Sequence, residues 1–361
     1  MVKLLVAGGG TGGHVFPALA VTKEWLRHED AFREGREAVF VGTKRGLENK
    51  LVPQAGIPLE HIRSAGLKGM GAIKLARHLA MLFPGFSDSA LILRKHRFNA
   101  AFGVGGYAAG PILMLAALKR IPVVIFEPNA EPGFTNRILA RFATRIATGY
   151  EETARRWGKK AVFTGCPVRE EFQSVAPRRP EPPFRILITG GTKGARPINR
   201  AVQEALTHLA ARNDDLLIVH QTGEREFQTV QAAYAAADFP AQVQPFLNDM
   251  PQRMAWADLI ISRSGQTTIA EIAAVGRAAL FIPFAGASDN HQLRNAQALE
   301  QAGAARVLTE ESLTGPRLAQ EILALLAKPE DLWLLASRTR QFARPDATRE
   351  IVNLIEQVQR T

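Results

Sequence analysis

Two glycine-rich turns lie about half a chain apart, and each follows an apolar run typical of a strand. The first, Gly-Gly-Gly-Thr-Gly-Gly-His at 8–14, follows Leu4–Ala7, and the second, Gly-Gly-Thr-Lys-Gly-Ala-Arg at 190–196, follows Ile186–Ile188. Such a turn before a helix points backbone N–H groups and the positive helix end at an anion. Two of them predict two similar α/β halves, one for a phosphorylated donor and one for an acceptor. For each, the alternative is a tight turn that binds nothing.

His14 is the first candidate for acid–base chemistry, because it opens the helix that follows the first turn. The positive end of a helix disfavours a charged imidazole, so a neutral His14 is able to accept a proton. We predict His14 as the catalytic base. The alternative is a helix-terminal residue without a chemical role.

The spacing Gly8-x-Gly10-x-x-Gly13 also fits the dinucleotide-binding pattern, which is a weak signal alone. A nicotinamide site further requires an acidic residue at the end of the second strand to hold the ribose. Here that strand ends in Phe-Val-Gly-Thr-Lys-Arg at 40–45, without an acid. The sequence therefore argues against NAD, and it has no Gly-x-x-x-x-Gly-Lys-Ser/Thr loop.

Other polar side chains follow predicted strands, where α/β proteins place their ligands. Asn129 could bind hydroxyl groups, and Glu127 could pair locally or orient a substrate. In the second half, the run 263–271 places donors at a helix start and a carboxylate, Glu271, one turn later, where it suits two ribose hydroxyls. Gln292 follows the strand 278–283. Ordinary loop chemistry and an ordinary capped helix are the alternatives.

Metal and redox chemistry have little support. The eight histidines are scattered, Cys166 is the single cysteine, and no Asp-x-Asp occurs, so we expect no protein-held metal. Helix ends and Arg169 would then hold diphosphate charge. The lone cysteine, the absence of a signal-like start and the absence of an apolar run of membrane-spanning length predict a cytoplasmic location.

Essentially all of the net positive charge lies in the first half of the chain. Residues 1–163 carry 24 Lys+Arg and 12 Asp+Glu, whereas residues 164–361 carry 21 and 22. Within 66–97, an apolar helical face is ringed by cations, as on a helix that lies on an anionic bilayer. A core-facing helix with a solvated basic side is the alternative. The predicted membrane contacts are Lys68, Ile73, Lys74, Arg77, Leu79, Phe83, Arg94 and Lys95.

Short apolar runs alternate with helical patterns along the whole chain, which predicts parallel sheets. The predicted strands are 2–7, 38–41, 98–104, 122–126, 142–148, 161–163, 184–189, 215–221, 243–246, 259–262 and 278–283, and the predicted helices include 13–27, 194–210, 266–275, 291–302 and 338–360. The proline-rich stretch 173–183 is predicted as a linker. We expect an N-terminal domain at 1–165, a C-terminal domain at 166–340, and a last helix at 341–361 that packs back on the N-terminal domain.

Several of these motifs occur together and in order: residues 9–17, Gly105-Gly106-Tyr107, Thr135-Asn136, 165–169, 190–196 and 263–271. The combination strongly resembles the MurG family, the bacterial N-acetylglucosaminyltransferases of peptidoglycan synthesis. The resemblance implies the α/β GT-B glycosyltransferase fold, with two Rossmann-like domains facing a central cleft. It implies transfer of GlcNAc from UDP-GlcNAc to the 4-hydroxyl of lipid I, with inversion, to give lipid II.

The resemblance also assigns site residues by motif. Thr11, Gly12, Gly13 and His14 would face the sugar and the acceptor diphosphate, and Asn129 would contact GlcNAc. Arg169 and Thr192 would approach the donor diphosphate, while the backbone of Leu247 would meet uracil. Phosphate and ribose would lie at Gln266, Thr267, Thr268, Ile269, Ala270 and Glu271, with Glu271 on the ribose, and Gln292 would bind the GlcNAc hydroxyls.

The implied partners are UDP-GlcNAc, lipid I (undecaprenyl-pyrophosphoryl-MurNAc-pentapeptide) and an anionic membrane surface, with no nucleic acid and no cofactor. Other cell-wall synthesis proteins are further candidates, and the expected location is the cytoplasmic face of the inner membrane, as a peripheral protein. Two other functions stay open at this point. One is a UDP-GlcNAc 2-epimerase or another GT-B enzyme, and the other is a non-catalytic peripheral membrane protein that binds nucleotide sugar.

Overall fold

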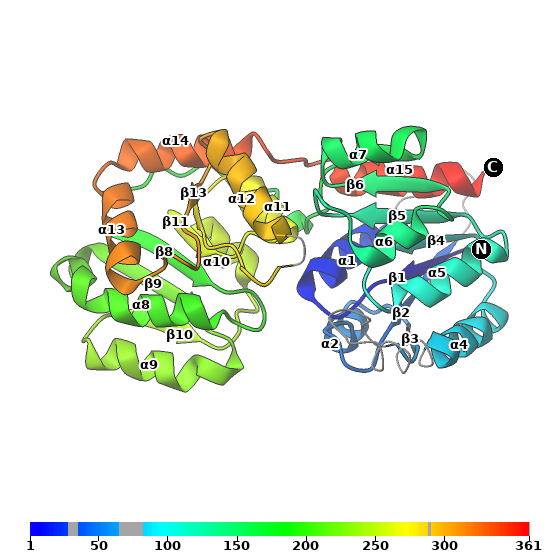
Figure 1. The fold of residues 1–361 in the computed structure, drawn as a ribbon, viewed down its shortest axis with the longest axis horizontal. Helices are drawn as coiled ribbons and strands as arrows, with labels where there is room; N and C mark the ends of the chain where they lie inside the picture. The colour runs from blue at the N-terminus through cyan, green and yellow to red at the C-terminus, as the bar shows by residue number, and fades with distance from the viewer. Residues whose placement is uncertain (28–34, 65–81, 288–289, 361) are drawn as a thin grey trace. The chain divides into compact units, whose positions relative to one another are not determined.

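The computed structural model describes residues 1–27, 35–64, 82–287 and 290–360. The chain folds into two compact units, Met1–Arg169 with Arg344–Thr361, and Glu170–Ala343. Each unit is a parallel sheet covered by helices (Figure 1). The alternation of strands and helices predicted from the sequence is therefore present in both.

The first unit contains a seven-stranded sheet in the order β3-β2-β1-β4-β5-β6-β7. Its strands are β1 Val2–Ala7, β2 Arg36–Gly42, β3 Leu59–His61, β4 Ala100–Gly103, β5 Val123–Glu127, β6 Arg145–Thr148 and β7 Ala161–Phe163. Its helices are α1 Gly12–Arg27, α2 Glu48–Gln54, α4 Leu82–Lys95, α5 Ala109–Leu118, α6 Phe134–Leu139, α7 Glu151–Trp157 and α15 Ala347–Gln359. Strand β3 was not predicted from the sequence; it is a three-residue edge strand without a buried residue.

The second unit contains a six-stranded sheet in the order β10-β9-β8-β11-β12-β13. Its strands are β8 Phe184–Thr189, β9 Leu216–Gln221, β10 Ala241–Gln244, β11 Leu259–Ser262, β12 Ala278–Phe281 and β13 Arg306–Val307. Its helices are α8 Arg196–Leu209, α9 Phe227–Ala236, α10 Met250–Trp256, α11 Gln266–Val275, α12 His291–Gln301, α13 Gly315–Leu326 and α14 Pro329–Arg340.

The strand order of each sheet reverses direction at the strand that precedes a glycine-rich turn. β1 lies between β2 and β4, and β8 lies between β9 and β11. In open parallel sheets, ligands bind outside the carboxyl ends of the strands at such a switch point. The topology therefore places each glycine-rich turn at the ligand-binding position of its own sheet.

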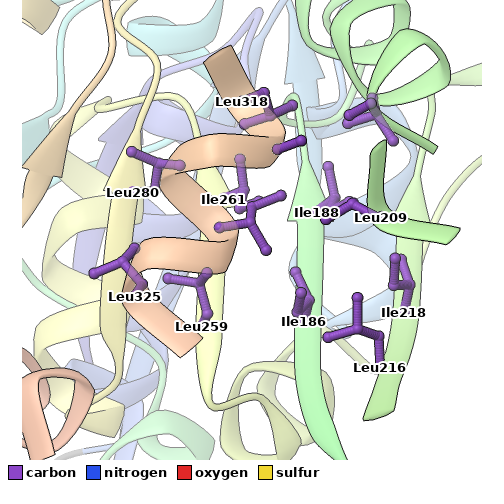
Figure 2. Close-up of a cluster of buried hydrophobic side chains, with 14 of the residues drawn as sticks. Ile186, Ile188, Leu209, Leu216, Ile218, Leu259, Ile261, Leu280, Leu318 and Leu325 are labelled. Carbon is purple, nitrogen blue, oxygen red and sulfur yellow. The ribbon is translucent and has the colours of Figure 1, made fainter. Parts of the chain in front are cut away.

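The strands β8, β11 and β12 of the second unit are apolar on both faces because helices cover both faces of the sheet. Ile186, Ile188 and Ile261 point to the face on which α8 and α13 pack (Figure 2). Leu187 and Ile260 point the other way, into a second cluster that includes residues of α11 and α12. Alternating side chains thus fill two cores, which explains why these strands read as continuous apolar runs.

The proline-rich stretch 173–183 belongs to the second unit and does not connect the two units, so the predicted linker is wrong. Arg178 Nε donates to Asp258 Oδ1 at 3.0 Å, and the other carboxylate oxygen of Asp258 accepts the Arg185 N–H at 2.9 Å. Asp258 is buried. A charge-assisted pair with a buried carboxylate therefore holds this stretch against the start of β8 and the end of α10.

The C-terminal part of the chain forms two helices, whereas a single helix over 338–360 is predicted from the sequence. The first, α14, ends at Arg340, and Pro345 precedes α15. Proline lacks the N–H that a continuing helix needs, which explains the break. Helix α15 contacts α1 and strands β4, β5 and β6 of the first unit (Figure 1), and Glu356 pairs with Arg36 at 2.9 Å.

Much of the predicted membrane segment, including Lys68, Ile73, Lys74, Arg77 and Leu79, lies outside the described residues, as does the side chain of Phe83. Arg94 and Lys95 form the exposed last turn of α4, and Lys95 Nζ pairs with Glu60 at 2.7 Å. Among the helices of the described ranges, none combines the length and the apolar character needed to cross a bilayer.

His220 gives the second unit a buried histidine that stays neutral. Its side chain is fully buried at the end of β9, with Nε2 3.1 Å from Asn199 Oδ1 and Nδ1 3.2 Å from the Tyr234 hydroxyl. The Asn199 amide nitrogen already donates to Thr222 O and Glu226, so Asn199 Oδ1 accepts from Nε2–H and Nδ1 accepts from Tyr234. Burial lowers the pKa of His220 to about 3.

We expect this neutral histidine to make the protein lose stability as the pH falls below about 6.5. In that range the unfolded chain binds a proton at His220 and the folded chain does not, so stability drops by about 1.4 kcal/mol per pH unit down to about pH 3. Urea unfolding of the wild type and of His220→Gln between pH 7 and pH 4 measures this. The variant lacks the titrating group and should show the shallower pH dependence; equal slopes would contradict the assignment.

Candidate active site

The first glycine-rich turn is held from behind by a buried carboxylate. Glu48, fully buried in the first turn of α2, accepts the Gly10 N–H at 2.9 Å through Oε2. Its Oε1 accepts the N–H of Thr43 at 2.9 Å and the Thr43 hydroxyl at 3.0 Å. A Cβ on Gly9 or on Gly42 would lie 2.5 Å from Glu48 atoms, so glycine is required at both positions for this carboxylate to fit.

His14 lies in the first turn of α1, next to two glycine turns. The Nδ1 atom of its ring is 3.3 Å from the Thr11 hydroxyl, and its backbone N–H donates to the Thr11 carbonyl oxygen at 3.1 Å. Gly106, which has a φ of +83°, follows β4, and a Cβ there would lie 3.0 Å from Gly9 O and 3.7 Å from His14 Nδ1. The two loops that leave the central strands β1 and β4 therefore approach each other closely at the imidazole.

A second buried carboxylate, Glu127, organises the loop after β5. It accepts the backbone N–H and the side-chain amide of Asn129 at 2.9 and 3.1 Å, the Gly133 N–H at 2.9 Å, and the Asn136 amide at 3.0 Å. Burial raises the pKa of Glu127, and the four donors oppose that rise. Because Asn129 donates to Glu127, its amide orientation is fixed and its carbonyl oxygen points away from that partner.

Arg169 is the last residue of the first unit, and its guanidinium carbon lies 4.6 Å from the ring centre of Phe16 in α1. The structure thus places Arg169 beside the helix of the first glycine turn, in the same unit as Thr11, Gly12, Gly13, His14 and Asn129. The aromatic face of Phe16 holds the guanidinium of Arg169 in place.

The second glycine-rich turn leads to a helix that no side chain caps. Gly191 and Gly194 have φ values of +83° and +72°, and a Cβ on Gly194 would overlap the Thr222 carbonyl. Helix α8 begins at Arg196 without a side-chain cap, and Thr192 is partly exposed before it. Uncapped N–H groups at a helix start are available to an anion.

Helix α11 also starts without a side-chain cap. Ser264, which the capping alternative would use, instead donates through Oγ to Gln292 O at 2.8 Å. Thr267 and Glu271 are both buried and, four residues apart, share one face of the helix. Ile269 packs into the second core cluster, so any ligand contact it makes is through its backbone.

The loop after β12 is joined to α12 by Gln292, whose Oε1 accepts the Phe284 N–H at 3.1 Å.

The predicted donor-site residues all lie in the second unit. They are Thr192, Leu247, Gln266, Thr267, Thr268, Ile269, Ala270, Glu271 and Gln292. Within the described ranges, no group of three or more His, Cys, Asp or Glu side chains is arranged to hold a metal ion.

Two buried residues of the site were not predicted. Glu48 lies just beyond the strand end at 40–45, where a nicotinamide site would need its acid, and Gln221 closes β9 in the sequence His-Gln-Thr-Gly at 220–223. The only sequence feature that could have indicated either residue is its polar side chain close to the end of a predicted strand. Glu48 also bears on the nicotinamide pattern, because it occupies the Gly10 N–H that a pyrophosphate would use.

Comparison with known proteins identifies the fold and the chemistry. Residues 4–148 match the glycosyltransferase family 28 N-terminal domain, and residues 185–355 match the glycosyltransferase family 28 C-terminal domain. A protein of Anaeromyxobacter sp. (strain Fw109-5), named UDP-N-acetylglucosamine--N-acetylmuramyl-(pentapeptide) pyrophosphoryl-undecaprenol N-acetylglucosamine transferase, is 42% identical over 99% of this chain and 94% of its own. The crystal structure of Acinetobacter baumannii MurG covers 99% of this chain and 100% of its own, with a TM-score of 0.75 and 34% identity.

The chain belongs to the MurG family of glycosyltransferases. Like other members of the MurG family it is a hexosyltransferase, and its two units are the two domains of the GT-B fold. The predictions of family, fold and enzyme class are confirmed. A UDP-GlcNAc 2-epimerase from Neisseria meningitidis, 13% identical with a TM-score of 0.69 over 99% of this chain and 100% of its own, shares the fold alone.

The buried Glu48 provides a direct test of how the first turn is held. Glu48→Ala leaves the Gly10 and Thr43 N–H groups without their acceptor, so we expect it to lower the free energy of unfolding of the first unit by at least about 2 kcal/mol. Glu37→Ala is the matched control, because Glu37 makes a partly exposed pair with Lys3 worth at most about 1 kcal/mol. Urea unfolding followed by tryptophan fluorescence measures both, and equal losses would contradict a specific role for Glu48.

Proposed function

We propose that this chain transfers GlcNAc from UDP-GlcNAc to the 4-hydroxyl of the MurNAc sugar of lipid I, giving lipid II and UDP. The observation that carries the proposal is the full-length likeness to enzymes named for this transfer. The carboxyl edges of the two sheets supply the chemistry. The edge of the second unit has groups suited to a nucleoside diphosphate, and the edge of the first unit has an imidazole and groups that could bind hydroxyls.

The second unit is the proposed donor site. The positive ends of α8 and α11 would attract the diphosphate, with Thr192 beside the start of α8. Glu271 suits a bidentate grip on the ribose hydroxyls, because a carboxylate accepts two hydrogen bonds at once. The Leu247 carbonyl would accept the uracil N3–H, since its own N–H already donates to Gln221. The Gln292 amide nitrogen would donate to a GlcNAc hydroxyl.

The first unit is the proposed acceptor site, with His14 as the base. A proton-accepting Nε2 requires the proton on Nδ1, and the Thr11 hydroxyl 3.3 Å away is placed to accept from Nδ1–H. Asn129 presents its carbonyl oxygen to a sugar hydroxyl. Arg169, held over Phe16, would attract phosphate oxygens.

Transfer then proceeds by one displacement with inversion. The 4-hydroxyl oxygen forms a bond to the anomeric carbon as the bond from that carbon to the β-phosphate oxygen breaks. The proton of the hydroxyl passes to His14 Nε2, and the electron pair of the broken bond leaves with UDP. Helix-end N–H groups stabilise the charge that develops on the leaving diphosphate, and stabilisation of this kind commonly contributes more to catalysis than any other single effect.

The base assignment predicts a selective loss of turnover. We expect His14→Ala to lower kcat by roughly 10²–10⁴-fold, because the hydroxyl loses its proton acceptor, while UDP-GlcNAc binding is retained. His208→Ala, an exposed histidine in α8, is the control and should keep full activity. A transfer assay with labelled UDP-GlcNAc and a lipid I analogue measures kcat, and calorimetry measures donor binding. A loss of less than about threefold in kcat would remove His14 from this role.

The same assay separates the proposed function from the two others that the sequence left open. Release of ManNAc from UDP-GlcNAc without any lipid acceptor would favour an epimerase. Saturable UDP-GlcNAc binding without sugar transfer would favour a non-catalytic protein. Running the assay with and without a chelator also tests whether a divalent metal aids turnover.

We further propose that the chain works as a peripheral protein at the cytoplasmic face of the membrane, held by the basic segment 66–97 on anionic lipid. Each cation near such a surface contributes about 1 kcal/mol, so replacing Lys68, Lys74 and Arg77 together by Ala should weaken binding to anionic vesicles by on the order of 100-fold. Replacing Arg155, Lys159 and Lys160 of the same unit is the charge-matched control. Vesicle co-sedimentation at several salt concentrations measures both, and equal binding of the two variants would contradict this surface.

A further inference from the structure

Gln221 joins two segments of the second unit that are distant in the sequence. It is the last residue of β9, and only 2% of it is exposed. Its Nε2 donates to the Thr189 hydroxyl oxygen at 3.2 Å and to Gly191 O at 3.0 Å. Its Oε1 accepts the Leu247 N–H at 2.8 Å. One carboxamide therefore holds both the glycine-rich turn after β8 and the loop after β10.

The partners fix which end of the carboxamide is which. Gly191 O can only accept, so it requires the amide nitrogen, and the Leu247 N–H can only donate, so it requires the amide oxygen. Thr189 Oγ1 also accepts the Gly191 N–H at 3.1 Å, which ties the turn to the end of β8 as well. These contacts form a small buried network in which the donors and acceptors of Gln221 are matched.

We propose that Gln221 is a positioning residue that sets the distance between the uracil-binding and diphosphate-binding ends of the donor site. This inference rests on the proposed function, in which Leu247 meets uracil and the turn at 190–194 with the α8 start meets the diphosphate. Gln221 touches neither end of the donor. It fixes the separation of two groups that must contact the same ligand at once.

The amide is required for its chemistry. Glutamate has nearly the same shape, but its carboxylate has no proton to donate to Gly191 O and would repel it. Leucine fills a similar volume yet leaves Gly191 O and the Leu247 N–H without their partner. Either change frees the two segments to shift relative to each other while each keeps its own local structure.

This role has a signature that a local binding residue would lack. A ligand that spans both ends gains affinity only when the ends are held at the right separation, because ordering them on binding costs free energy. A ligand that contacts one end alone does not depend on that separation. Disturbing Gln221 should therefore weaken UDP far more than uridine, which lacks the diphosphate.

The test compares Gln221→Leu and Gln221→Glu with Gln242→Leu and Gln242→Glu, since Gln242 is exposed on the neighbouring strand β10. Competition calorimetry gives the Kd of UDP and of uridine, and the transfer assay gives KM and kcat. We expect the Gln221 variants to raise the Kd of UDP and the KM of UDP-GlcNAc by about tenfold or more. We expect the Kd of uridine and the kcat at saturating donor to change by less than about threefold, and the Gln242 variants to match the wild type.

Two results would overturn the proposal: an unchanged Kd of UDP in the Gln221 variants, or equal losses for UDP and uridine, which would indicate general disruption of the site. Thr189→Val removes the hydroxyl partner of Gln221 with little change of shape and keeps the proposal testable if the Gln221 variants do not fold. It should weaken UDP more than uridine, and equal effects on both would again contradict the proposal. Failure of wild-type protein to bind UDP at all would instead refute the proposed function.

Discussion

The site depends on backbone N–H groups that must be held in place without side chains of their own. A glycine-rich turn can approach a phosphate closely because it lacks Cβ atoms, but for the same reason it is costly to order. In each unit a buried polar side chain from a neighbouring segment supplies that order. Glu48 bonds Gly10 and Thr43 in the first unit, and Gln221 bonds Gly191, Thr189 and Leu247 in the second. These contacts hold the turns in the positions that the glycines allow.

The parallel sheets make such contacts possible. Because β1 and β8 lie at the switch points of their sheets, the loops from the strands on either side reach the same edge. Glu48 follows β2, Gly106 follows β4, and both meet the first turn after β1. Gln221 at the end of β9 meets the turn after β8 in the same way. Burial of both sheet faces fixes the register of these strands and so the positions from which their loops leave.

The sequence predicted the strands that are buried on both faces, because their apolar runs are bounded by glycine or proline. It also predicted both glycine turns and the helix at Gln266–Val275, with limits that match the structure. It missed β3 and β13, which are short edge strands with little buried surface. It missed Glu48 and Gln221 for a different reason. Their role comes from contacts between segments that are distant in the chain, and a buried polar residue carries no periodic signal of its own.

The chemical difference between the two supporting residues matches the difference between the two sites. Glu48 is a carboxylate that occupies the Gly10 N–H and places an acceptor-only group behind the first turn, which reduces what that turn offers to an anion. Gln221 is uncharged and bonds the Gly191 carbonyl and the Leu247 N–H, while the Gly191 N–H donates to Thr189 Oγ1. In the proposed function, the leaving nucleoside diphosphate gains negative charge, which an uncharged amide behind the turn does not repel. In the proposed function, the uncharged support thus belongs to the donor turn and the charged support to the acceptor turn.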